Sequence, residues 1–206
     1  MSVACGNSDE TGGEHPVPDP APPNPASGAA PAPAAGRISR TIALVGLMGV
    51  GKSTVGKKLA ETLGAPFVDS DDEIVKAAKL SITEIFERHG EAEFRRGERR
   101  VIERLLNGPP IVLATGGGAF MDPDTRALMK EKATTVWLKA DLDVIWKRVS
   151  RRENRPLLKR DNPKQVLADL DQARAPFYAE ADYVVESGEG PYTEAVKAIR
   201  KALGYS

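Results

Sequence analysis

Short apolar runs alternate along this chain with longer stretches in which apolar residues recur every three or four positions. Continuous apolar runs are typical of strands buried on both faces of a parallel sheet, whereas the longer spacing indicates amphipathic helices. We predict strands at residues 41–45, 66–68, 111–114, 134–139 and 183–186. We predict helices at 52–63, 72–78, 91–106, 123–132, 141–149, 163–181 and 192–203, and one more that opens at Ser81 and ends near Gly90.

The order of these elements predicts an α/β fold. Strands that alternate with helices form a parallel sheet with helices on both faces and right-handed crossovers. Ligands of such sheets bind at the carboxyl ends of the strands. Segments rich in glycine or aspartate follow three of the predicted strands, at residues 46–54, 69–72 and 115–118. We therefore expect one site where these segments meet.

Residues 1–36 differ from the rest of the chain. They are rich in proline and alanine and almost lack bulky apolar residues, so we predict a disordered tail ahead of one folded domain at 37–206. The tail is acidic and the remainder mildly basic, which favours anionic small molecules over nucleic acid as partners. Cys5 is the only cysteine, and no apolar run is long enough to span a membrane. We expect a cytoplasmic enzyme that binds neither membranes nor nucleic acid.

Residues 46–54 read Gly-Leu-Met-Gly-Val-Gly-Lys-Ser-Thr, between a predicted strand and a predicted helix. This is the pattern of a phosphate-binding loop in the context that the pattern requires. Backbone N–H groups and the start of the helix would bind polyphosphate, with Lys52 as a cation and Ser53 as a ligand of Mg²⁺. A glycine-rich turn that binds nothing is the alternative, and the complete motif argues against it. We predict that ATP contacts Gly49, Val50, Gly51, Lys52, Ser53 and Thr54.

Asp69 and Asp71 follow the second predicted strand. On an extended segment their side chains point to different sides, so one can face a magnesium ion and the other a second substrate. Capping of the next helix is the alternative function of these acids. Thr115 precedes three glycines, which suggests that a ligand approaches the backbone closely; a flexible turn is the alternative here.

Basic residues mark two further candidates. Residues 150–162 are basic, polar and interrupted by Pro156, so we predict a mobile loop there. Its stretch at 151–158 could close as a lid over phosphates and deliver an arginine. A nucleic-acid patch is the alternative, but aromatic residues hardly interrupt this segment. Arg95 lies on the charged helix at 91–106, where it can bind a carboxylate through two hydrogen bonds or remain solvated surface.

In their order along the chain these motifs resemble the shikimate kinase family. The resemblance covers about residues 38–203. It rests on residues 46–54, Asp69-Ser70-Asp71, Ile85-Phe86, Gly90-Glu91, Phe94-Arg95, Thr115-Gly116-Gly117-Gly118 and Arg155-Pro156-Leu157-Leu158. It implies a P-loop fold like that of nucleoside monophosphate kinases, with sheet order 2-3-1-4-5. A substrate-binding segment near 70–98 and a lid near 150–163 are also implied.

The resemblance implies an enzyme that uses ATP and Mg²⁺ to phosphorylate the 3-hydroxyl of shikimate, a step towards chorismate and the aromatic amino acids. By this resemblance Asp71 holds the ring hydroxyls, and Arg95 and Arg174 bind the carboxylate. The remaining implied roles are substrate contacts by the backbone of Gly116, Gly117 and Gly118, magnesium binding by Ser53 and Asp69, ATP contacts by Arg148 and Arg155, and catalysis by Lys52, Asp71 and Arg155.

Two other functions remain as alternatives. Another small-molecule kinase of the same fold, acting on gluconate or a nucleotide, would use the same phosphate-binding loop. A GTPase-like switch protein would need an Asn-Lys-x-Asp motif and an Asp-x-x-Gly segment after a core strand, and neither stands in this chain. We expect a monomer.

Overall fold

A computed structural model of the protein describes residues 38–150 and 162–205. The predicted tail at 1–36 lies outside the described residues. Most of the predicted lid, including Arg155, lies outside them as well.

The described residues contain a five-stranded sheet in the order β2-β3-β1-β4-β5, in which every neighbouring pair is parallel. This confirms the predicted sheet and strand order. The strand bounds are β1 Thr41–Val45, β2 Phe67–Asp69, β3 Val112–Ala114, β4 Ala133–Lys139 and β5 Tyr183–Glu186. Because β1 lies between β3 and β4, its carboxyl end opens at the middle of the sheet, where a ligand can reach segments from both sides.

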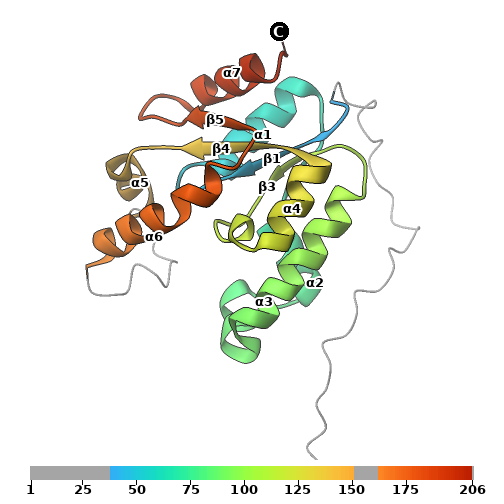
Figure 1. Cartoon of the computed structure of the whole chain (residues 1–206), viewed down its shortest axis with the longest axis vertical. Helices are drawn as coiled ribbons and strands as arrows, with labels where there is room; N and C mark the ends of the chain where they lie inside the picture. The colour runs from blue at the N-terminus through green and yellow to red at the C-terminus, as the bar shows by residue number, and fades with distance from the viewer. Residues whose placement is uncertain (1–37, 151–161, 206) are drawn as a thin grey trace, which may run out of the picture. The chain divides into compact units, whose positions relative to one another are not determined.

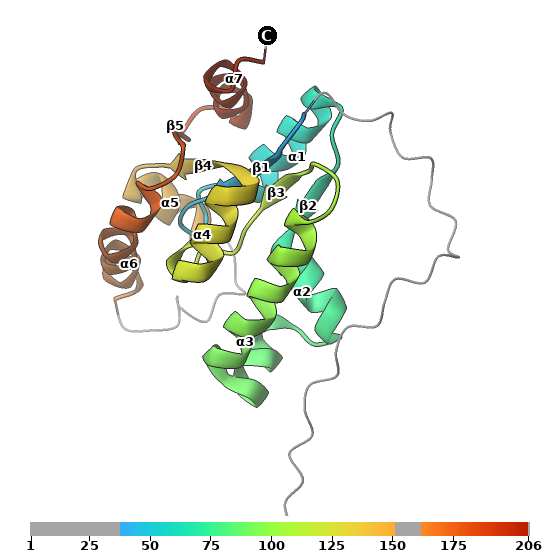
Figure 2. The same ribbon diagram turned by 45° about the vertical axis from the view of Figure 1, so that its right-hand side comes forward.

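Helices cover both faces of the sheet. The bounds are α1 Lys52–Leu63, α2 Ser70–Ala78, α3 Ile82–Leu106, α4 Pro123–Lys132, α5 Leu142–Val149, α6 Pro163–Tyr178 and α7 Tyr192–Ala202. Figures 1 and 2 show α1 and α7 together on one face of the sheet, and α4 beside α3 on the other. Helices α2 and α3 pack on each other and extend away from the sheet (Figure 2).

Local signals explain where several helices begin and end. The side chain of Asp122 accepts a hydrogen bond from the Thr125 N–H, and Pro123 takes the first helical position of α4, as the sequence predicts. Ser81 and Glu84 form a capping box at the start of α3, where the sequence predicts that a helix opens. Gly90 has a φ of 76° and divides α3 into two helical segments, which confirms it as a break.

Other boundaries differ from the prediction. Strand β2 ends at Asp69 and α2 begins at Ser70, so Asp71 lies in the first turn of a helix. The expectation that both acids stand on an extended segment is therefore wrong. Helix α6 ends at Tyr178, earlier than predicted, and a short 3₁₀ helix, η1 (Ala119–Met121), was not predicted.

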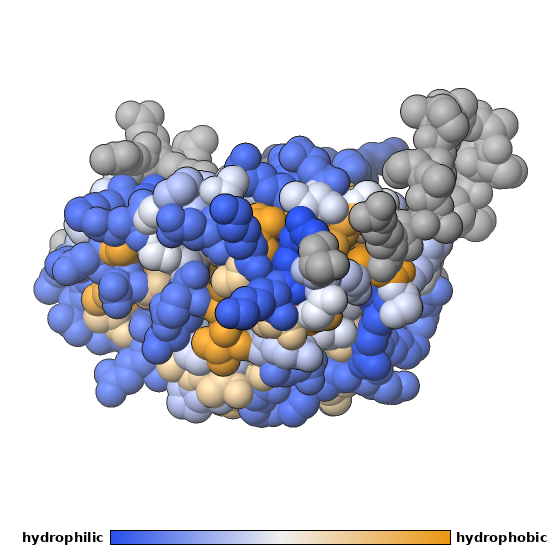
Figure 3. Space-filling view, turned by 90° about the horizontal axis from the view of Figure 1, so that it is seen from above, coloured by the Kyte–Doolittle hydropathy of each residue, from blue (hydrophilic) through white to orange (hydrophobic). Residues whose placement is uncertain are grey.

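The core lies between the central strands and the helices that cover them. Ala43, Leu44 and Leu113 on β1 and β3 are fully buried, because both faces of a parallel sheet are covered. A second, smaller cluster of Ile74, Ile85, Phe94 and Val101 joins α2 to α3. The face seen in Figure 3 is mostly hydrophilic, with hydrophobic side chains in separate small areas. Within the part of the chain that the structure describes, no helix has the length and hydropathy needed to cross a membrane.

Candidate active site

A cavity of about 140 Å³ lies at the carboxyl ends of β1, β2 and β3. It brings together most of the residues predicted from the three separate segments. Its lining comprises Met48, Gly49, Gly51, Lys52, Ser53, Thr54, Asp69, Asp71, Thr115, Gly117, Arg148 and Tyr192. The expectation that these segments share one site is confirmed.

The phosphate-binding loop between β1 and α1 owes its shape to glycine. Gly46, Gly49 and Gly51 have φ values of 133°, 82° and 106°, a region that residues with a side chain rarely adopt. A Cβ at Gly46 would stand 2.4 Å from the Leu138 carbonyl oxygen. The buried Lys52 ammonium donates hydrogen bonds to the carbonyl oxygens of Gly46, at 2.7 Å, and Leu47, at 3.0 Å. The lysine therefore lies across the inside of the loop, where a polyphosphate would bring acceptors of its own.

Ser53 and Asp69 form the candidate magnesium site. The Ser53 hydroxyl donates to Asp69 Oδ2 at 2.6 Å, and Asp69 Oδ1 accepts the Asp71 N–H at 3.1 Å. One aspartate thus caps α2, as the alternative predicted, and its other oxygen faces the phosphate-binding loop. A hydroxyl and a carboxylate are hard oxygen ligands of the kind that Mg²⁺ prefers. No cluster of three or more histidine, cysteine or acidic residues able to hold a metal occurs at residues 38–150 or 162–205. The pair fits a magnesium ion that takes its other ligands from phosphate and water.

Two carboxylates converge on Gly116. A Cβ added there would lie 2.8 Å from Asp71 Oδ1 and 2.8 Å from Glu98 Oε1. Glu98 is only 2% exposed, and its Oε1 accepts no hydrogen bond within the described residues. Burial raises the pKa of Glu98, the nearby Arg95 lowers it, and Asp71 and Asp122 raise it further; the net direction is upward. Sequence analysis missed Glu98, although its position three residues after Arg95 on one helix was a usable signal.

Arg95 lies beside the third glycine of the same segment. Its guanidinium binds Glu98 Oε2 at 2.6 Å and Glu91 Oε1 at 3.3 Å. A Cβ at Gly118 would stand 2.4 Å from Arg95 Nη2, so the absence of a side chain there makes room for the arginine. The alternative of a fully solvated arginine is wrong, since the side chain is 26% exposed and paired.

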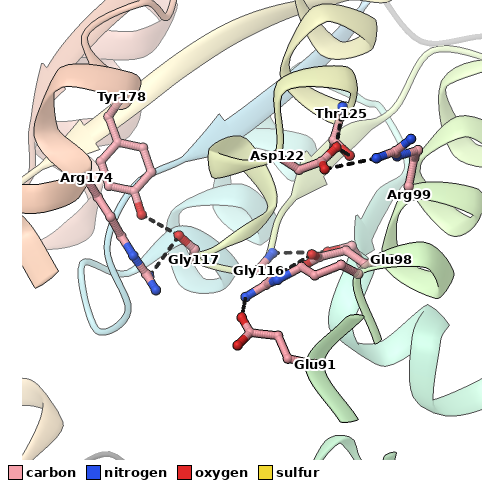
Figure 4. A network of polar contacts seen from close by, with 11 residues as sticks. Glu91, Glu98, Arg99, Gly116, Gly117, Asp122, Thr125, Arg174 and Tyr178 are labelled. Carbon is pink, nitrogen blue, oxygen red and sulfur yellow. Dashed lines mark hydrogen bonds and ion pairs between the residues drawn. The ribbon is translucent and has the colours of Figure 1, made fainter. Parts of the chain in front are cut away.

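Arg174 reaches the glycine segment from α6. Its Nη1 donates to the Gly117 carbonyl oxygen at 3.2 Å, and the Tyr178 hydroxyl donates to the same oxygen. Figure 4 shows both side chains pointing from α6 towards Gly117, with Glu98 and Glu91 on the other side of the segment. The two arginines predicted to bind one carboxylate therefore border the same three-glycine segment.

Arg148 borders the phosphate-binding loop. Its Nη1 donates to the Val50 carbonyl oxygen at 3.0 Å, and its guanidinium stacks over the Tyr192 ring at 4.9 Å. A Cβ at Gly51 would come within 2.6 Å of the Tyr192 ring. Tyr192 lines the cavity and was not predicted, because its sequence neighbourhood carries no motif.

The comparisons with known proteins agree with these features. Residues 48–204 match the family described as Shikimate kinase. Over 165 residues the chain is 58% identical to a shikimate kinase of Caulobacter vibrioides, covering 80% of this chain and 82% of that protein. It is 54% identical over 171 residues to one from Paramagnetospirillum magneticum, covering 82% and 88%. A solved shikimate kinase from Acinetobacter baumannii, in complex with shikimate, is 41% identical with a TM-score of 0.76, covering 80% of this chain and 93% of that one.

Proposed function

The chain belongs to the shikimate kinase family, and we propose that it transfers the γ-phosphoryl group of ATP to the 3-hydroxyl of shikimate. The products are ADP and shikimate 3-phosphate, on the route to chorismate and the aromatic amino acids. One observation carries the proposal: a single cavity joins the phosphate-binding loop to Asp71 and Gly117, so a nucleotide and a small polyol can meet in it.

On the nucleotide side, the loop N–H groups of Gly49 to Thr54 and the N-terminal end of α1 bind the phosphates. Lys52 exchanges its contacts with the Gly46 and Leu47 carbonyls for contacts with phosphate oxygens. Ser53 and Asp69 would hold a magnesium ion, which when bound neutralises charge on the phosphates. Arg148, beside the loop, flanks the adenine.

On the acceptor side, Asp71 orients the reacting hydroxyl and accepts its proton. In a loose, metaphosphate-like transition state little deprotonation is needed early, so orientation is the larger contribution. Arg95 and Arg174 bind the shikimate carboxylate from the two sides of the glycine segment, through charge-assisted hydrogen bonds. The backbone of Gly116 to Gly118 lies against the ring.

Arg155, outside the described residues, completes the proposal as the arginine of a lid. It would bind the transferring phosphoryl group as charge spreads onto its oxygens, together with Lys52. Loss of such an arginine lowers kcat more than it raises KM, because its contact strengthens in the transition state.

A coupled assay of ADP release tests the substrate. Shikimate, gluconate and nucleoside monophosphates are compared with the full chain, ATP and Mg²⁺, and turnover is expected with shikimate. Asp71→Asn should lower shikimate turnover by about 10² or more while ATP still binds. Asp72→Asn, one residue further along α2 and exposed, is the matched control. Turnover of gluconate or a nucleotide in place of shikimate would overturn the proposal in favour of the alternative kinase.

The monomeric state and the cytoplasmic location stay predictions from the sequence. Light scattering on the purified full chain and fractionation of cells that express it are the corresponding measurements.

A further inference from the structure

Two side chains of α6 meet at one backbone oxygen of the glycine segment. Arg174 Nη1 and the Tyr178 hydroxyl both donate to the Gly117 carbonyl (Figure 4). The two residues stand four positions apart, which places them on the same face of the helix. Of the two, only Arg174 carries a positive charge that would attract a substrate carboxylate.

The Tyr178 side chain is packed in the protein core and does not line the cavity. Its side chain is 1% exposed, and its ring lies 5.8 Å from the ring of Trp137 on β4. Burial raises the pKa of Tyr178 to about 12, so the hydroxyl keeps its proton at neutral pH and remains a donor. A neutral, buried donor is not drawn away when an anion enters the site, whereas a guanidinium is.

The contact fixes the direction of a peptide plane. In a trans peptide the C=O and N–H point in opposite directions, so the Gly118 N–H faces away from the α6 side chains that hold the Gly117 carbonyl. The two preceding planes are held separately. The Gly116 carbonyl accepts the Ala119 N–H at 3.1 Å, and the Gly116 N–H donates to the buried Ser70 hydroxyl at 3.1 Å. Tyr178 and Arg174 therefore supply the restraint on the second half of the segment.

We propose that Tyr178 is a positioning residue for binding of the acceptor substrate, acting through the Gly117 carbonyl. Its hydroxyl keeps the Gly118 N–H aimed correctly and leaves the Arg174 guanidinium available for the substrate carboxylate. The inference rests on the proposed function, because it assumes an anionic acceptor beside Arg174. In this role Tyr178 supports substrate binding without touching the substrate itself.

Tyr178→Phe in the full chain tests this directly, because it removes one hydroxyl and keeps the ring against Trp137. The KM for shikimate should rise by roughly 3- to 10-fold, the value of one neutral hydrogen bond. The KM for ATP should stay within about twofold, since the hydrogen bond of the Tyr178 hydroxyl goes to Gly117 and not to the phosphate-binding loop. Tyr183→Phe, on the partly exposed edge of β5, is the matched control and should change neither constant.

The proposal would be overturned if the KM values for shikimate and ATP rose equally, or if the KM for shikimate did not change. Either outcome would leave Tyr178 a purely structural residue. Failure of the parent enzyme to phosphorylate shikimate would instead contradict the proposed function, so the two failures are distinguishable.

A second measurement applies even if Tyr178→Phe fails to fold. A fluorinated tyrosine incorporated at position 178 keeps the volume of the side chain but lowers the pKa of its hydroxyl. Once deprotonated, the oxygen cannot donate to the Gly117 carbonyl. The KM for shikimate should therefore begin to rise at a lower pH in the fluorinated protein than in the parent, while the KM for ATP follows the same profile in both. Coincident shikimate profiles would contradict the proposal.

Discussion

The active-site cavity is bordered by two glycine-rich segments that need glycine for different reasons. In the phosphate-binding loop the reason is conformational, because Gly46, Gly49 and Gly51 have positive φ. In the segment after β3 it is spatial. Gly118 has an ordinary φ of −100°, and its missing side chain makes room for the guanidinium of Arg95.

This difference determines how each segment should respond to a side chain. In the first segment, a Cβ at Gly46 conflicts with the backbone conformation of its own residue and with a rigid neighbour, the Leu138 carbonyl on β4. In the second segment, a Cβ at Gly118 meets the far end of a flexible arginine, Arg95, which can move aside but then leaves its place in the site. A side chain in the first segment should therefore disturb the fold, whereas a side chain in the second should displace a group that binds substrate.

The largest effect is expected for Gly46→Ala. The φ of 133° and the 2.4 Å approach to Leu138 both oppose a side chain. Backbone strain of about 3 kcal/mol lowers Tm by roughly 6–12 °C at this size, and activity should fall with it. Thermal melts of the variant and of Gly64→Ala, also at positive φ but with open space around it, separate strain from collision. A Tm of Gly46→Ala within about 2 °C of the parent would show that the phosphate-binding loop does not need glycine for its conformation.

Arg95→Ala should have the next largest effect, mainly on substrate binding, although it also removes the ion-pair partner of the buried Glu98. Loss of a charge-assisted contact to the carboxylate raises the KM for shikimate by roughly 10- to 100-fold. Arg96→Ala, on the exposed side of α3, is the matched control. A shikimate analogue with a neutral amide sharpens the test, because the mutation should penalise it much less than shikimate. An equal penalty for both compounds would show that Arg95 supports the fold instead.

Gly118→Ala should reproduce a part of the Arg95 effect without the loss of stability expected for Gly46→Ala. The φ of −100° suits alanine, and the three atoms nearest to the added Cβ all belong to the flexible Arg95 guanidinium. We expect a KM for shikimate that is roughly 3- to 10-fold higher, the loss of about one hydrogen bond, with Tm changed by less than about 4 °C. The KM for shikimate and the Tm, measured on the same preparation of Gly118→Ala, test both expectations. A large Tm loss with an unchanged KM would show that the two segments need glycine for the same reason.

The smallest effect is a pH dependence at Glu98. Because burial raises the pKa of this carboxyl in the folded state, folding favours its protonated form. The contribution of Glu98 to stability therefore falls as pH rises above 4.5, the ordinary pKa of the group, through the raised value. Glu98→Gln removes this titration, so the Tm of the variant should gain a few degrees relative to the parent as the pH rises from 4.5. Exposed Glu87→Gln should show no such trend, and a pH-independent difference for Glu98→Gln would contradict the argument.

Much of this fold was predictable because its signals are local. Strand β1 and helix α4 have their predicted bounds, since an apolar run and a capped, proline-initiated helix need only neighbouring residues. The boundary between β2 and α2 was not predictable in the same way. Asp69 both ends the strand and caps the helix, so helix begins where the alternation of a strand was expected to continue.

In the site, too, residues that belong to a local motif were predictable, whereas contacts between residues distant in the sequence were not. Lys52 and Ser53 were predicted from one loop, and Asp71 from its place after a strand. The Tyr178 contact joins residues 61 positions apart, and the Ser70 contact to Gly116 joins residues 46 apart. No spacing in the sequence indicates such pairs, because they depend on how α6 and α2 dock on the sheet.

The bonds around the three glycines have a consequence for the energetics of binding. A run of glycines has the widest choice of backbone conformations in an unfolded chain, and ordering it carries a large entropy cost. Here Ser70, Ala119 and Tyr178 hold the segment in the folded protein before any ligand arrives. That cost is met during folding, so a substrate that binds against this segment has little backbone left to order.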